Sequence, residues 1–188
     1  MKQQLFNQLS SHGPLSVEAW QALAGRLVFQ RLPAGVELFR PGDTHDYLYY
    51  IVSGLARGYY LDGGKEVTAW LATEGDVVFS RAGFLLRKEN GESVELLENA
   101  ELVCITRQDF DELCHRFPDI IQLGWRLMQR YLLAQENRLR LLRQAKAENR
   151  LEYFRQQHPE WWNRVQNQHI ASFLGIDPAT LSRLLRKR

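Results

Sequence analysis

The chain has 188 residues, of which 45% are hydrophobic and 24% charged. This is the balance of an ordinary globular protein with one medium domain, or one medium and one small domain. No stretch reaches the ~18 apolar residues of a membrane span, and residues 1–13 lack the apolar core of a secretion signal, so we expect a cytoplasmic protein with no membrane partner. Cys104 and Cys114 alone cannot hold an iron–sulfur cluster or structural zinc, so we expect plain thiols, no metal and no cofactor.

The net charge of +2 conceals an uneven distribution along the chain. Residues 1–115 carry 10 Lys and Arg against 16 Asp and Glu, a net charge of −6, whereas residues 138–188 carry 11 against 4, a net charge of +7. An acidic front and a basic tail predict that the tail meets a polyanion. A basic tail can also be simply solvated, so the interpretation depends on a motif within it.

The first thirty residues are predicted to be helical. Ser16 is a suitable N-cap for a helix that follows it. The apolar residues of this helix recur at helical spacing. They are Val17, Trp20, Leu23, Ala24 and Leu27.

From about residue 28 to residue 107 the pattern changes to short apolar runs separated by turn sequences such as RPGD and EGD. The runs are rich in Val, Ile, Tyr and Trp, which favour strands. Asp62-Gly63-Gly64 is a strong hairpin signal. Runs spaced about 8–12 residues apart predict an antiparallel sandwich or barrel of jelly-roll type.

From Arg107 the sequence is helical to its end. Residues 108–115 suit a short helix, and Pro118 fits the first turn of a long one. In the long helix, seven positions are spaced alternately four and three residues apart, as in an a/d heptad seam. These expected dimer-interface residues are Ile121, Trp125, Met128, Leu132, Gln135, Leu139 and Leu142. A second apolar stripe would pack on the barrel, which leaves the seam for the same helix of a second subunit in a two-fold dimer. The alternative is a helix packed on its own barrel alone.

The last part of the chain carries a helix-turn-helix pattern in residues 167–186, NQHIASFLGIDPATLSRLLR. Ala171 lies where two helices come close, Gly175 lies at the turn, and Asp177-Pro178 supply an N-cap and a first-turn proline. This is the bihelical DNA-binding pattern. The preceding Trp161-Trp162 is expected to pack in the core between these helices.

The polar face of the second helix has the side chains that DNA binding requires. We expect Arg183 to read a base, and Gln168, Thr180 and Lys187 to contact phosphates. The full set of candidate DNA-binding residues is Gln168, Asp177, Thr180, Ser182, Arg183, Arg186 and Lys187. The alternative for each arginine is an ordinary surface charge.

The whole pattern resembles the CRP/FNR superfamily of bacterial regulators. The matching segments are ELFRPGD (37–43), YLYYIVSG (47–54), GKEVTAWLATEGD (64–76), RQDFDELCHRFPDI (107–120) and the terminal helix-turn-helix. The resemblance implies an α+β fold, with a cyclic-nucleotide-binding-like β-roll and flanking helices in residues 1–117, a dimerisation helix in 118–145 and a helix-turn-helix DNA-binding domain in 146–188. It also implies a homodimer that binds a two-fold-symmetric DNA site. RNA polymerase and an unidentified small-molecule effector are further candidate partners.

Two departures from the family qualify the resemblance. Members that bind cyclic AMP hold the ribose with a glutamate and the cyclic phosphate with an arginine, but Ser80 stands in the first position here, and Asn90 or Glu92 in the second. A carboxylate facing a phosphate is repulsive, so we predict that cyclic AMP does not bind in the usual way. The residues of a possible different effector pocket are Ser80, Arg81, Arg87, Lys88, Glu92, Ser93 and Gln135. The second departure concerns the end of the chain. Family members usually continue into a β-hairpin wing, whereas this sequence ends at Arg188 with RLLRKR. We expect this basic end to replace part of the wing's phosphate contacts.

An enzyme is the least favoured class. Metal-dependent jelly-roll enzymes require clustered histidines and a carboxylate on neighbouring strands, and only His45 lies in the strand region. The sequence also shows no nucleophile–base spacing and therefore predicts no catalytic residues. The stronger alternative to a DNA-binding regulator is a dimeric sensor or adaptor whose helix-turn-helix no longer binds DNA.

Overall fold

The computed structural model describes residues 2–186. Two short helices, α1 (Lys2–Ser10) and α2 (Val17–Ala24), precede a region of eight strands. The strands are β1 (Val28–Leu32), β2 (Glu37–Phe39), β3 (Tyr47–Ser53), β4 (Ala56–Asp62), β5 (Lys65–Ala72), β6 (Val77–Phe79), β7 (Ser93–Leu96) and β8 (Ala100–Thr106). A single π-helical turn, η1 (Arg81–Leu85), lies between β6 and β7. The sequence pattern gave no indication of this turn.

The strands form two four-stranded antiparallel sheets that face each other. Their orders are β1-β8-β3-β6 and β2-β7-β4-β5. The expected hairpin is present, because β4 and β5 pair through Asp62 and Lys65 on either side of Gly63-Gly64. Alternate residues of the strands fill the space between the sheets, where Phe39, Ile51 and Val94 are fully buried. The jelly-roll prediction is confirmed.

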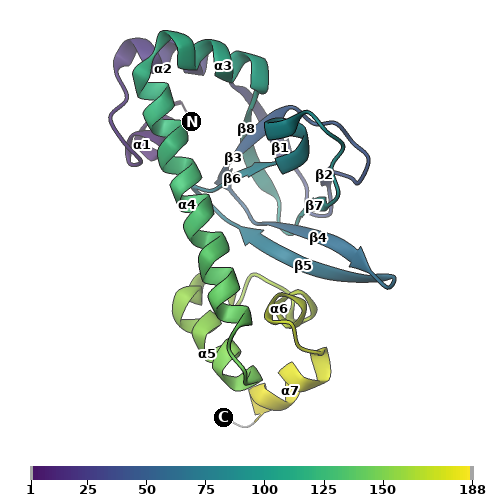
Figure 1. Ribbon diagram of the computed structural model, residues 1–188. Helices are drawn as coiled ribbons and strands as arrows, with labels where there is room; N and C mark the ends of the chain where they lie inside the picture. The colour runs from purple at the N-terminus through teal and green to yellow at the C-terminus, as the bar shows by residue number, and fades with distance from the viewer. Residues whose placement is uncertain (1, 187–188) are drawn as a thin grey trace.

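A second apolar core lies on the outer face of the β1-β8-β3-β6 sheet. Helices α1 and α2, the helix α3 (Arg107–Arg116) and the first half of α4 (Pro118–Leu142) cover this face. Ser16 caps α2 as expected, but Val17 is 60% exposed and does not belong to the buried face of that helix. The long helix α4 then runs along the molecule from these helices to the C-terminal ones (Figure 1).

The C-terminal part consists of α5 (Ala147–Gln157), the short 3₁₀ turn η2 (Pro159–Trp161), α6 (Asn167–Leu174) and α7 (Pro178–Arg186). These elements enclose a third core around Phe154, Trp161 and Phe173. Trp161 is buried and stacks on His158 with ring centroids 3.8 Å apart, which confirms its expected role in packing. Leu55 and Leu71 of the β-roll join the same core. The helical part is therefore packed against the β-roll rather than tethered beside it.

Candidate nucleic-acid interface and effector cavity

The turn between α6 and α7 has the local structure that its sequence predicts. Gly175 ends α6 in the left-handed conformation, with φ of +62°, which glycine adopts without steric cost. The Ile176 amide then donates a hydrogen bond to the Ala171 carbonyl at 3.0 Å. Ala171 is fully buried, which allows the two helices to approach each other. Leu181 inserts from α7 into the third core, so the angle between α6 and α7 is fixed by packing.

Asp177 caps α7 and begins a chain of polar contacts along it. The Thr180 amide donates to the Asp177 carboxylate at 2.8 Å, and the Thr180 hydroxyl donates to the same carboxylate at 2.6 Å. These two hydrogen bonds hold the pKa of Asp177 below its ordinary value. Arg183 in turn donates to the Thr180 hydroxyl at 2.8 Å. The cap thus positions the guanidinium of Arg183 on the outer side of the helix.

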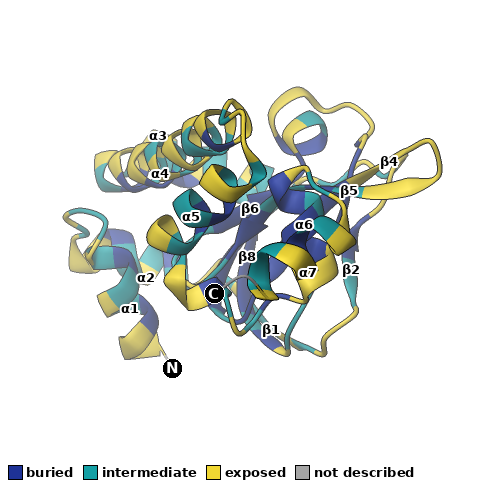
Figure 2. Cartoon of the chain, turned by 90° about the horizontal axis from the view of Figure 1, so that it is seen from below, coloured by how far each residue is buried: buried dark blue, intermediate teal, exposed yellow. Residues whose placement is uncertain are grey.

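The outer face of α7 is exposed and basic. Ser182, Arg183 and Arg186 are all exposed, whereas Thr180 is half-buried (Figure 2). Gln168, near the start of α6, is also exposed. Lys187, the seventh candidate DNA-binding residue, lies outside the described residues. The structure therefore brings the predicted residues of α7 onto one accessible face.

Helix α6 packs against β5, the edge strand of its sheet. The Thr68 amide donates to the Ser172 hydroxyl at 2.8 Å, and the same hydroxyl donates to the Glu66 carbonyl at 3.3 Å. Arg138 of α4 donates to the carbonyls of Thr68 and Ala69 at 3.3 and 3.2 Å. Burial lowers the pKa of Arg138 to about 10. These side chains satisfy backbone groups that an edge strand would otherwise leave unpaired.

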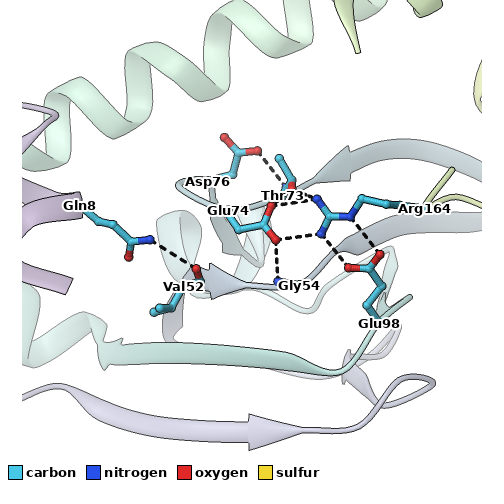
Figure 3. A network of polar contacts seen from close by, with 8 residues as sticks. All are labelled: Gln8, Val52, Gly54, Thr73, Glu74, Asp76, Glu98 and Arg164. Carbon is cyan, nitrogen blue, oxygen red and sulfur yellow. Dashed lines mark hydrogen bonds and ion pairs between the residues drawn. The ribbon is translucent and has the colours of Figure 1, made fainter. Parts of the chain in front are cut away.

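A second contact between the helical part and the β-roll is centred on Arg164, which follows η2. Its guanidinium pairs with Glu98 at 2.7 Å and with Glu74 at 2.8 Å, and it also donates to the Thr73 hydroxyl at 3.1 Å (Figure 3). Burial opposes ionisation of Glu74, but hydrogen bonds from Arg164, Thr73 and the Gly54 amide outweigh it and lower the pKa of Glu74 to about 2. Neither Arg164 nor Ser172 is predicted from the sequence, because their partners lie 66 to 106 residues away.

The heptad seam of α4 faces outward from the chain. Ile121, Trp125, Leu132 and Leu139 are 53 to 60% exposed, although they are large apolar side chains. By contrast, Leu123 and Leu127 of the other stripe are buried against the β-roll. Gln135 is half-buried, and Leu142 lies beside the Gly175 turn. A contiguous row of exposed apolar side chains on one helix is typical of an interaction surface.

Three of the seven residues predicted for an effector pocket line one cavity of about 40 Å³ between the β-roll and α4. They are Arg81, Glu92 and Gln135. The buried Glu92 carboxylate accepts hydrogen bonds from Trp70 Nε1 at 3.0 Å and from Arg81 at 3.1 Å. The indole of Trp70 lies directly over Gly58, where a Cβ atom would fall 2.0 Å from the ring. The cavity is therefore small and occupied on one side by an ion pair.

The other four predicted pocket residues do not line this cavity. Ser80 is fully buried and caps η1 by accepting a hydrogen bond from the Gly83 amide at 2.9 Å. Ser93 is buried in β7. Arg87 and Lys88 lie exposed after η1, because the turn directs them away from the β-roll interior. Spacing along the sequence does not reveal this, since it depends on the unpredicted π-helical turn.

Among residues 2–186, no three His, Cys, Asp or Glu side chains gather in a group that could hold a metal ion. None of the helices in that range is long and apolar enough to cross a membrane. Cys104 is a buried free thiol and Cys114 a half-buried one, as expected.

Comparison with known proteins identifies the family. Residues 29–117 match the family described as cyclic nucleotide-binding domain. The chain is 30% identical to the cyclic AMP receptor protein of Thermus thermophilus over 165 residues, which cover 84% of this chain and 76% of that protein. It is 28% identical to the fumarate and nitrate reduction regulatory protein of Vibrio cholerae over 164 residues, covering 80% of this chain and 64% of the relative.

The fold is shared with solved regulators as well. The c-di-GMP responsive global regulator CLP of Xanthomonas campestris superposes with a TM-score of 0.74 at 18% identity, covering 92% of this chain and 91% of that one. This likeness shows that the two chains share a fold. The chain belongs to the CRP/FNR family. It is therefore a transcriptional regulator of that type and not an enzyme.

Proposed function

We propose that the protein acts in the cytoplasm as a homodimer that binds a two-fold-symmetric DNA site with α7 in the major groove. The observation that carries the proposal is the outer face of α7. It presents Ser182, Arg183 and Arg186 to solvent, while the inner face is fixed in the third core. An arginine on such a helix can donate two hydrogen bonds to the O6 and N7 atoms of guanine.

The exposed seam of α4 supports the dimer. Two copies of α4 packed through Trp125, Leu132 and Leu139 would remove these side chains from water. A two-fold dimer of this kind presents two α7 helices to one DNA duplex, and each reads one half-site. The net charge of +7 on residues 138–188 attracts this part of the chain to the DNA backbone.

We further propose that cyclic AMP does not control the protein. The β-roll cavity of about 40 Å³ is far smaller than the roughly 300 Å³ of a small ligand pocket. Its buried Glu92 carboxylate would also repel a cyclic phosphate, and Arg81 is already paired with it. Isothermal titration of the protein with cyclic AMP is expected to show no binding. An affinity in the micromolar range would contradict this part of the proposal.

The DNA proposal is tested by selecting bound fragments from a random-sequence duplex library and titrating the best one by fluorescence anisotropy. Arg183→Ala is expected to lower the affinity for the selected site by about tenfold or more and to relax the base preference at one position in each half-site. Arg31→Ala, which removes the same charge from an exposed position in β1, is the matched control and is expected to leave specificity unchanged. Binding without any sequence preference, or none at all, would favour the dimeric adaptor instead.

A further inference from the structure

A cavity of about 340 Å³, far larger than the β-roll cavity, lies outside the β1-β8-β3-β6 sheet and is partly open to solvent. It lies between this sheet, the N-terminal helices, α3 and the first half of α4. Its inner wall consists of side chains that are at most 5% exposed. They are Leu9, Leu23, Val103, Ile105 and Ile120. The cavity is therefore a partly open apolar pocket set against the second core.

The chemistry of the lining defines the ligand class. Phe79, Phe84 and Phe110 form one side, with ring centroids 5.9 and 6.3 Å apart in tilted pairs. Apolar cavities of less than half this size exclude water and bind small aromatic molecules. A cavity of about 340 Å³ is also within the usual size range of small-ligand sites. We infer that this cavity binds an uncharged, mostly apolar small molecule about the size of two fused aromatic rings.

The polar groups at the cavity offer nothing to a charged ligand. Arg107 and Asp111 at the rim pair with each other at 2.7 Å, and Arg107 also donates to the Phe84 carbonyl. Cys114 is kept as a neutral thiol, because burial and the nearby Asp111 raise its pKa. Burial likewise raises the pKa of Tyr50 to about 12. A ligand with a net charge would therefore leave that charge without a partner inside an apolar site.

The outer wall of the cavity connects it to the rest of the molecule. Ile121, Trp125 and Met128 of α4 line the cavity, and they also belong to the heptad seam. A bound ligand therefore contacts residues that a second copy of α4 would contact. A partner's side chains would meet the mouth of the cavity, whereas the inner wall belongs to α1, α2, β8 and the start of α4 of the same chain. This coupling to the dimer rests on the proposed function, whereas binding itself does not.

The test uses N-phenyl-1-naphthylamine, an uncharged fluorescent probe, with the full chain in the absence of DNA. Saturable binding of one probe per chain is expected. The anionic relative 8-anilino-1-naphthalenesulfonate, which adds one sulfonate to the same ring system, is expected to bind at least tenfold more weakly. Val103→Phe and Leu48→Trp each fill the cavity from the sheet and are expected to weaken probe binding at least tenfold. Val28→Phe makes a similar change on an exposed part of β1 and should leave binding unchanged.

Thermal unfolding shows whether the filled variants are still folded. Val103→Phe should keep or raise the Tm because it fills space, whereas Val94→Phe in the tightly packed core between the sheets should lower it. Three results would overturn the inference. The first is no saturable binding to the wild-type chain, and the second is equal binding by the wild type and both folded filled variants. The third is binding that disappears when the protein concentration is raised enough for dimers to form, because the partner then fills the cavity.

Discussion

Leu132 lies on the exposed seam of α4 and is 54% exposed in a single chain. Full burial of a leucine side chain stabilises by about 1.5–3 kcal/mol, so covering the exposed half is worth roughly 1 kcal/mol. A two-fold interface contains each side chain twice, which makes the contribution roughly 2 kcal/mol per dimer. Because a difference of about 1.4 kcal/mol is a factor of ten in an equilibrium constant, Leu132→Ala is expected to raise the dimer Kd ~30-fold.

Leu133 supplies a matched control for this prediction. It is the next residue of the same helix, and it is also strongly exposed, at 60%. It lies outside the a/d seam, so Leu133→Ala removes the same atoms from a position that a dimer should leave in solvent. Sedimentation equilibrium of the wild type and both variants gives the three dissociation constants directly. An unchanged Kd for Leu132→Ala, or an equal change in Leu133→Ala, would show that the seam does not form the interface.

Three further predictions concern the contacts that join the helical part to the β-roll. Ser172→Ala leaves the buried amide of Thr68 without its acceptor and should lower the free energy of unfolding by roughly 1 kcal/mol in urea denaturation, whereas Ser182→Ala on the exposed face should change it little. Arg164→Ala should lower the Tm at pH 7. The Tm difference from the wild type should shrink as the pH falls from 4.5 towards 2, because the Glu74 carboxylate, whose pKa is lowered in the folded chain, is then protonated and its ion pair with Arg164 is lost. Burial lowers the pKa of His158 and of His169 in the folded chain, so these residues bind protons more readily when the chain is unfolded. The Tm should therefore fall as the pH drops below about 6.5. An unchanged Tm between pH 7.5 and 5.5 would contradict this.

Local signals in the sequence were sufficient to predict the elements but not the way in which they contact one another. The β4–β5 hairpin, the Ser16 cap, the turn at Gly175 and the cap at Asp177 each depend on a few adjacent residues, and all four are present. The fold class followed from their order. The exposed seam of α4 could also be predicted, because helical periodicity assigns each residue to one face of the helix.

The contents of the effector region could not be predicted in the same way. Arg87 and Lys88 were grouped with Glu92 by proximity in sequence, yet the π-helical turn and the positive φ of Arg87 place them in solvent. The ion pair of Arg81 with Glu92 joins η1 to the residue before β7, and Trp70 of β5 meets Gly58 of β4 across the hairpin; no motif in the sequence marks either contact. The 340 Å³ cavity is the clearest case, since its walls come from eight different elements and no motif marks it.

The orientation of α7 is a property of the whole chain and not of the helix-turn-helix alone. Leu55 just before β4 and Leu71 near the end of β5 are part of the third core, which also holds Leu181 of α7. The backbone of β5 is bound by Ser172 of α6 and by Arg138 of α4, and the Arg164 contacts hold the loop that follows β5. A shift of the β4–β5 hairpin would therefore move α6, and α7 with it, because the two helices share one packed core. The link between the β-roll and the proposed DNA-binding face is thus made of direct contacts, and it passes through the hairpin as well as through α4.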